Sequence, residues 1–168
     1  MTASEIFLDY AAGGPLDPRV RGAMEPWLEA AGPSGLHDAA RGPAEMLEAA
    51  REAVAALVGG AAPEIIFTAG ATEARNLAVK GLARANRRLG GDLVATTLED
   101  PAVRAALRTL GAREAATVLD VPVDGEGFVD PRQLEAAITE TTALVCIPHG
   151  QGDIGTLQDL PALVAAVR

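Results

Sequence analysis

The stretch TAGATEA, residues 68–74, has the residue types that bind an anion. Its glycine and alanines let a ligand approach the backbone, and Thr72 stands where a helix begins, so free backbone N–H groups and the helix dipole favour negative charge. Thr72 followed by Glu73 is equally typical of an ordinary capped helix start. Spacing alone leaves the two interpretations balanced: an anion cradle at Ala71 and Thr72, or a capped N-terminus.

Few other residues suggest chemistry. His149, just past an apolar strand pattern, stands where a ring can face a ligand, whereas His37 falls in a loop. Lone histidines are more often packed side chains, and these two lack metal-ligand spacing, so we expect no metal site. The adjacent Glu99 and Asp100 are either an acid/base pair or the charged cap of the next helix, and we favour the cap. Cys146, the only cysteine, lies in the apolar ALVCIP stretch and is expected to be a buried, inert thiol.

The elements that must position these residues follow an α/β pattern. A helix is expected from Asp17, with Pro18 at its first position and Pro26 dividing it, and another over 43–58, closed by Gly59. Further helices are expected near 72–89, 100–110, 131–139 and 160–168. They alternate with four short strand candidates: EIIFT (64–68), DLVATT (92–97), ATVLDVPV (116–123) and ALVCI (143–147).

Strand and helix in alternation predict a mainly parallel sheet of about four strands with helices on both faces, a three-layer α/β fold. We expect one domain over residues 1–168, with an N-terminal helical segment (1–60) and a sheet-forming part (61–168). Three loops, TAGATEA, TTLEDPA and PHGQGDIGTLQ, follow the carboxyl ends of strand candidates, where ligands collect in open parallel sheets. They are therefore expected to converge on one site.

Composition excludes some classes of function. The net charge of −9 and the aromatic content of 3% argue against a nucleic-acid partner, which requires a basic face and usually stacking rings. The N-terminus lacks a basic region followed by an apolar one, and no apolar run approaches the roughly 20 residues that span a bilayer. We therefore expect a cytoplasmic protein without a membrane partner.

Six stretches, in the same order along the chain, resemble the N-terminal part of cysteine desulfurases, the class V aminotransferase-like enzymes of the fold-type-I pyridoxal-phosphate (PLP) group. They are FLDYAAGGPLDPRV, GPSGLHDAARGPAEMLEAAREAVAALVG, EIIFTAGATEARNLAVKG, ATTLEDPAV, VPVDGEGFVDPRQLEAAI and HGQGDIGTLQDL. The resemblance covers this whole chain and less than half of a typical member. It implies that the loop at Ala71 and Thr72 holds the PLP phosphate, and that His149 and Gln151 occupy cofactor-facing positions.

The chain departs from the family pattern at several of these positions. Arg75 stands where the family often has asparagine, and Asp100 where a histidine stacks on the PLP ring. After the fourth strand candidate, His149-Gly-Gln151-Gly-Asp replaces His-X-Asn-Asn-Glu, and near the N-terminus AAGGP replaces Ala-Ala-Thr-Thr-Pro. These changes remove an aromatic face, amide groups and two hydroxyls.

The family's Schiff-base lysine, in a Ser-X-His-Lys stretch, and its sulfur-accepting cysteine correspond to positions beyond this sequence. Lys80, the only lysine, falls at a position that is structural in the family. The resemblance therefore implies non-covalent PLP binding at most, through the phosphate loop, and no catalytic residue within this chain.

The resemblance leaves three hypotheses of function. The chain is a desulfurase-related domain that is not catalytic alone, or one half of a split PLP enzyme completed by a partner chain, or a fragment of a longer enzyme. In the family, later strands lie between earlier ones, so the four strands alone would leave gaps in the sheet. We expect a protein partner or self-association to fill them, unless the strands rearrange.

Overall fold

The computed structural model describes residues 6–10 and 13–167. Ala11 and Ala12 of the AAGGP stretch lie outside the described residues. Contacts divide the chain into two compact units, Met1–Phe67 and Thr68–Arg168.

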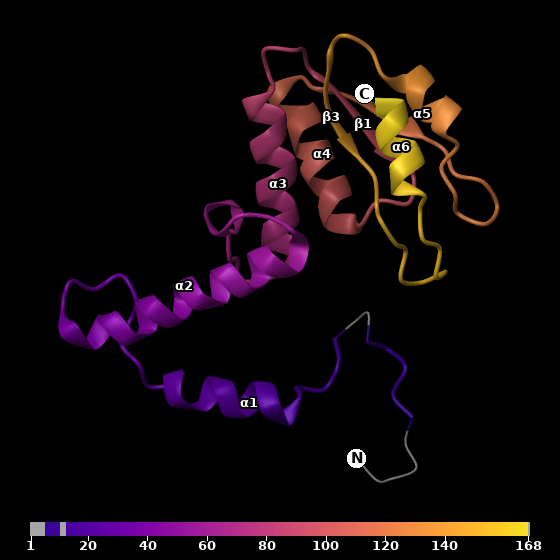
Figure 1. Ribbon diagram of the computed structural model, residues 1–168. Coiled ribbons are helices and arrows are strands. Elements are labelled where there is room, and N and C mark those ends of the chain that lie inside the picture. The colour runs from indigo at the N-terminus through magenta and orange to yellow at the C-terminus, as the bar shows by residue number, and fades with distance from the viewer. Residues whose placement is uncertain (1–5, 11–12, 168) are drawn as a thin grey trace. The chain divides into compact units, whose positions relative to one another are not determined.

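The first unit is helical, as expected. It contains α1 (Pro18–Met24), the 3-10 turn η1 (Glu25–Trp27), α2 (Asp38–Val58) and a second 3-10 turn, η2 (Ala62–Glu64) (Figure 1). The Asp17 carboxylate accepts a hydrogen bond from the Arg19 backbone N–H at 2.8 Å, which confirms the expected cap, and Pro18 is the first helical residue. Pro26 lies in η1 and separates α1 from the residues that follow, also as predicted.

Helix α2 differs from the prediction at its start. It begins at Asp38, five residues before the expected start at Pro43, which lies inside the helix. A proline near the beginning of a helix removes one backbone hydrogen bond, and this cost does not stop the helix here. The helix ends as predicted, at Gly59 with a φ of 71°, a conformation that glycine adopts without a Cβ penalty.

The strand expected at EIIFT does not form. Glu64 belongs to η2, and residues 65–68 have no strand partner among the described residues. The Ile65 carbonyl oxygen accepts a hydrogen bond from Arg51 Nη1 at 2.5 Å, and the same guanidinium lies 5.2 Å from the centre of the Phe67 ring. An apolar β-branched run predicts a strand only where a neighbouring strand supplies the backbone partners, and the described residues contain no such strand beside this run.

The second unit forms the sheet. In chain order it contains α3 (Ala71–Ala85), β1 (Asp92–Thr96), α4 (Pro101–Glu114), β2 (Thr117–Val121), α5 (Pro131–Ala137), β3 (Thr142–Cys146) and α6 (Leu160–Val167). The three strands pair directly in the order β2-β1-β3 and are all parallel. The gaps that we expected between strands are therefore absent from this sheet, because the first strand candidate does not enter it.

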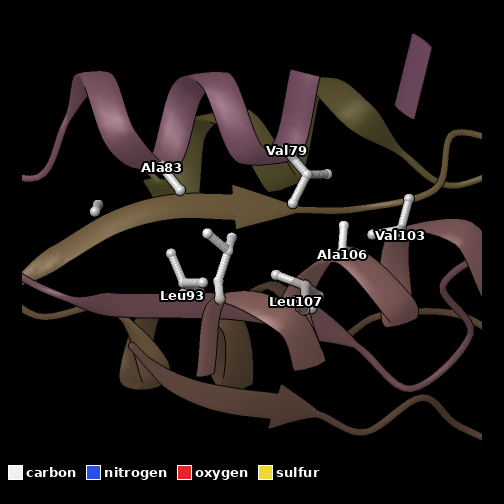
Figure 2. Packing of buried hydrophobic residues seen from close by; sticks show 9 residues of the cluster. Val79, Ala83, Leu93, Val103, Ala106 and Leu107 are labelled. Atoms are coloured by element: carbon white, nitrogen blue, oxygen red, sulfur yellow. The ribbon is translucent and has the colours of Figure 1, made fainter. Parts of the chain in front are cut away.

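Helices cover both faces of this sheet, which confirms the three-layer α/β class (Figure 1). On one face, α3 and α4 pack on β1 and β3 through a buried cluster: Val79, Ala83, Leu93, Ala95, Val103, Ala106, Leu107, Leu110 and Ala143. Figure 2 shows how side chains of α3 and α4 gather around Leu93. On the other face, α5 and α6 contribute Leu134 and Leu163, which pack on Val94 and Val121. The alternation of Leu93 and Ala95 against Val94 follows the two-residue period of a strand that is buried on both sides.

None of the helices in the described part of the chain combines the length and the apolar character needed to cross a bilayer. In the second unit, the loops that follow the strands extend from a sheet that helices cover on both faces.

Candidate functional site

The start of α3 lies beside the loop that follows β1. Arg75 Nη1, in the second turn of α3, is 3.1 Å from Asp100 Oδ2, at the start of α4. Asp100 comes four residues after Thr96, the last residue of β1. The start of α3 and the TTLEDPA loop therefore lie side by side at the carboxyl edge of the sheet, although TAGATEA does not follow a strand as we expected.

The first turn of α3 is held by its own residues. Gly70 precedes the helix, with open space where a Cβ would stand, and Ala71 and Thr72 are exposed. Glu73 Oε2 accepts a hydrogen bond from the Ala69 backbone N–H at 2.7 Å, while Asn76 Nδ2 donates to the Thr72 carbonyl at 2.9 Å. Because the residue that precedes the helix is Gly70, Thr72 is not the cap. The negative charge of Glu73 complements the dipole at the N-terminus of α3. Apart from its two chain neighbours, no atom of the described residues lies within 4 Å of the position that a Cβ on Gly70 would occupy.

Asp100 has two partners, one on each neighbouring helix. Its Oδ1 accepts from the Ala102 backbone N–H at 2.8 Å and caps α4, which confirms the predicted cap. Its Oδ2 pairs with Arg75, whose side chain remains 44% exposed. On a helix, Arg75 shares a face with Ala71 and Thr72, and helical side chains lean toward the N-terminus. The Arg75 guanidinium is thus directed toward the first turn of α3 and is partly neutralised there by Asp100.

Glu99 is not a cap, contrary to our expectation. Its Oε1 is buried and has no hydrogen-bond partner among the described residues, and the same is true of Thr96 Oγ1. Burial raises the pKa of Glu99 from 4.5 to about 7; the nearby charge of Arg104 opposes this shift and that of Asp100 adds to it. Arg104 in turn forms a two-point ion pair with Asp120 of β2, which holds the pKa of that carboxyl below its ordinary value.

His149 and Gln151 lie in the loop after β3. His149 is exposed, and its carbonyl oxygen accepts from the Gln158 backbone N–H at 2.9 Å. Gln151 Oε1 accepts from the Asp153 backbone N–H at 2.8 Å, so this part of the Gln151 amide stabilises its own loop. The structure places both residues at the same edge of the sheet as Asp100, after the carboxyl end of β3.

The surroundings of Lys80 and Cys146 indicate structural roles. Lys80 lies nine residues into α3, about 13 Å along the axis from Ala71, and its charge acts on Glu114, the last residue of α4. It therefore belongs to the opposite edge of the sheet. Burial raises the pKa of the Cys146 thiol to about 12, in agreement with the expected inert role. The described residues contain no group of three or more side chains arranged to hold a metal ion.

A parallel sheet covered on both faces by helices defines an α/β protein, in which ligands collect at the carboxyl ends of the strands. The family model for aminotransferase class V matches residues 6–168, so the chain belongs to this family.

Cysteine desulfurases are among the proteins that the chain resembles. The chain is 38% identical over 161 residues to the cysteine desulfurase IscS of Dictyoglomus turgidum, covering 95% of this chain and 41% of the relative. It is 40% identical to the IscS of Stutzerimonas stutzeri, covering 94% and 40%. A solved structure described as a NifS-like protein superposes with a TM-score of 0.89 at 30% identity, over 95% of this chain and 44% of that one. The chain thus spans about two fifths of the length of its curated relatives.

The family is PLP-dependent, and the residues present fit one end of this cofactor. The open space at Gly70, the helix start at Ala71 and the guanidinium of Arg75 suit a phosphate group. Lys80, the only lysine of this sequence, lies near Glu114 at the other edge of the sheet. The described residues at this edge therefore suit the phosphate end of the cofactor.

The sequence did not reveal the Arg75–Asp100 pair or the buried Glu99. A signal was present for the pair, because the two departures from the family pattern on these neighbouring helices carry opposite charges. No signal identified Glu99, because a carboxylate beside a helix start predicts an exposed cap.

Proposed function

We propose that residues 1–168 form a cysteine desulfurase-related module that binds the phosphate end of PLP without a covalent bond and does not catalyse desulfuration by itself. The observation that carries this proposal is the placement of the sole lysine. The α3 N-terminus opens at the carboxyl edge beside Asp100, whereas Lys80 lies toward the other end of the same helix.

In this proposal each residue has a limited role. The backbone N–H groups at Ala71 and Thr72 donate to the phosphate, and Arg75 adds positive charge. Asp100 pairs with Arg75 through its Oδ2, so it competes with the phosphate for this guanidinium, while its Oδ1 caps α4. His149 and Gln151 border the same edge after β3. PLP, when bound in a complete enzyme, supplies the electron sink for reactions of amino acids.

The test compares PLP binding by the wild-type chain and by Lys80→Ala. Equilibrium dialysis should give equal affinities for PLP, much weaker binding of pyridoxal, which lacks the phosphate, and no alanine or sulfide from cysteine. After borohydride reduction, mass spectrometry should find no PLP attached to either protein. Attachment that is lost in Lys80→Ala, or sulfide release by the purified chain, would contradict the proposal.

A second candidate function has its own observation. The chain covers 41% of the Dictyoglomus turgidum relative, and in the described part of the chain the outer edges of β2 and β3 have no strand partner. Unpaired edges favour association with another polypeptide. On this alternative the chain is part of a PLP-dependent desulfurase, completed by further residues of its own or by a partner chain, and it associates with itself when neither is present.

The alternative is tested by complementation. The chain is mixed with the remaining three fifths of the Dictyoglomus turgidum relative, produced as a separate polypeptide, and alanine and sulfide release from cysteine is measured. Sedimentation of each component and of the mixture records assembly. A stable complex with activity would favour the split or fragmentary enzyme over the non-catalytic module, while a complex without activity would favour the module.

A further inference from the structure

The loops that follow the three strands are joined around one short hairpin. After β2, Val123 and Val129 form an antiparallel bridge, and the Asp124 backbone N–H donates to the Phe128 carbonyl at 3.0 Å. After β3, a similar bridge between Gly150 and Leu157 closes the loop that begins at His149. Each of these two loops is thus closed by a bridge within itself, and side-chain contacts connect one loop to the other.

Gln158 makes the connection with both atoms of its side-chain amide. Oε1 accepts from the Val129 backbone N–H at 3.0 Å, and Nε2 donates to the Gly127 carbonyl at 2.6 Å. The residue is 7% exposed, so these bonds are shielded from water. Its own backbone N–H donates to the His149 carbonyl at 2.9 Å. Gln158 therefore ties the backbone of His149 to the hairpin after β2.

Two further contacts hold the loop after β3 against the hairpin after β2. Thr156 Oγ1 donates to the Glu126 carbonyl at 2.6 Å. Gly127 has a φ of 85°, and a Cβ placed there would lie 2.5 Å from Ile154 Cδ1 and 3.2 Å from Leu98 Cδ1. Leu98 belongs to the loop after β1 and immediately precedes Glu99. The loops after β1 and β3 therefore both contact the hairpin that follows β2.

We infer that Gln158 is a positioning residue: by holding the 123–129 hairpin with its side chain and the His149 carbonyl with its backbone, it fixes where His149 and Gln151 lie at the candidate site. A neutral amide suits this place because it offers one donor and one acceptor to two buried backbone groups. The inference uses the proposed function only for its cofactor measurement, since the position of His149 is measured without any ligand.

The experiment uses the full chain with Gln158→Leu, which keeps most of the volume and removes both side-chain hydrogen bonds. NMR should show shifted His149 ring signals and hydrogen exchange of the Val129 amide that is at least about tenfold faster. PLP binding in dialysis should weaken by at least about threefold. Gln158→Glu, which keeps the acceptor for Val129 and loses the donor to Gly127, should restore part of the Val129 protection.

Leu107→Val is the matched control, because it removes volume from the buried cluster of α3 and α4 and leaves the hairpin contacts intact. If Gln158→Leu changes His149 and Val129 no more than Leu107→Val does at a similar loss of thermal stability, Gln158 is only a core residue and the inference is wrong. If Gln158→Leu does not fold, Gln158→Glu replaces it, and unchanged His149 signals in that variant would equally overturn the inference. Failure of the wild-type chain to bind PLP contradicts the proposed function, while the NMR result still decides the role of Gln158.

Discussion

Glu99 gives the folded chain a pH dependence near neutrality. Its pKa is about 7 in the folded state against an ordinary 4.5, chiefly because of burial, so the folded state binds this proton more tightly. The resulting stabilisation is fully present below pH 4.5 and is lost as the pH rises through 7. We expect Glu99→Gln to be more stable than the wild type at pH 8, with the difference shrinking toward pH 5. Urea unfolding at several pH values measures this, with Glu135→Gln on the exposed side of α5 as the control for loss of one carboxylate.

Asp100 sets the charge beside the first turn of α3. Its carboxylate neutralises Arg75, so an incoming phosphate must compete with it. Asn retains the capping oxygen and removes the charge, and we therefore expect Asp100→Asn to bind PLP or inorganic phosphate about twofold to fivefold more tightly, the range typical of an exposed ion pair. Asp130→Asn is the matched control, because Asp130 caps α5 through the Arg132 backbone N–H at 2.9 Å. Equal effects of the two substitutions, or weaker binding by Asp100→Asn, would contradict this account of the site.

At the scale of elements, α4 ends on an unusual residue. Ala115 has a φ of 56°, which costs a residue with a Cβ about 1 kcal/mol and costs glycine little. Ala115→Gly is expected to raise the free energy of unfolding by up to about 1 kcal/mol. Ala112→Gly, the same chemical change three residues earlier inside α4, should lower it by about 0.5–1 kcal/mol. Urea titrations of the two variants should therefore move in opposite directions from the wild type, and a shift in the same direction would refute the argument.

The sequence predicted helix ends correctly where they depend on neighbouring residues. Caps at Asp17 and Asp100 and the glycine stop at Gly59 depend on neighbouring residues only, and all three are observed. The strand predicted at 64–68 depended on a distant partner, and it was wrong because the described residues contain no strand that pairs with it; the Ile65 carbonyl bonds to Arg51. The site shows the same division: the loops at the carboxyl edge were expected from topology, whereas the Gln158 contacts join residues about 30 positions apart and leave no local pattern.

At the scale of the whole molecule, the two units have very different cores. Among the described residues, the buried apolar side chains of Met1–Phe67 are two alanines, Ala40 and Ala55, whereas Thr68–Arg168 buries five leucines in its two clusters on α4, α5, α6 and β1. Large apolar side chains of the first unit are exposed instead, including Leu28 at 73% and Leu57 at 85%. Burial of apolar area is the main source of folding free energy, so the first unit has little of its own.

We therefore expect residues 68–168, produced alone, to unfold cooperatively in urea, and residues 1–67, produced alone, to show no cooperative transition. In the full chain, hydrogen exchange should be fast through α1 and most of α2 and slow in β1 and α4, because exchange follows the local free energy of opening. Addition of a polypeptide that covers the exposed apolar residues of the first unit should slow exchange there and leave β1 unchanged. A cooperative transition in residues 1–67 alone would show that its exposed leucines are not needed for stability, and would remove the reason to expect a protein partner on that unit.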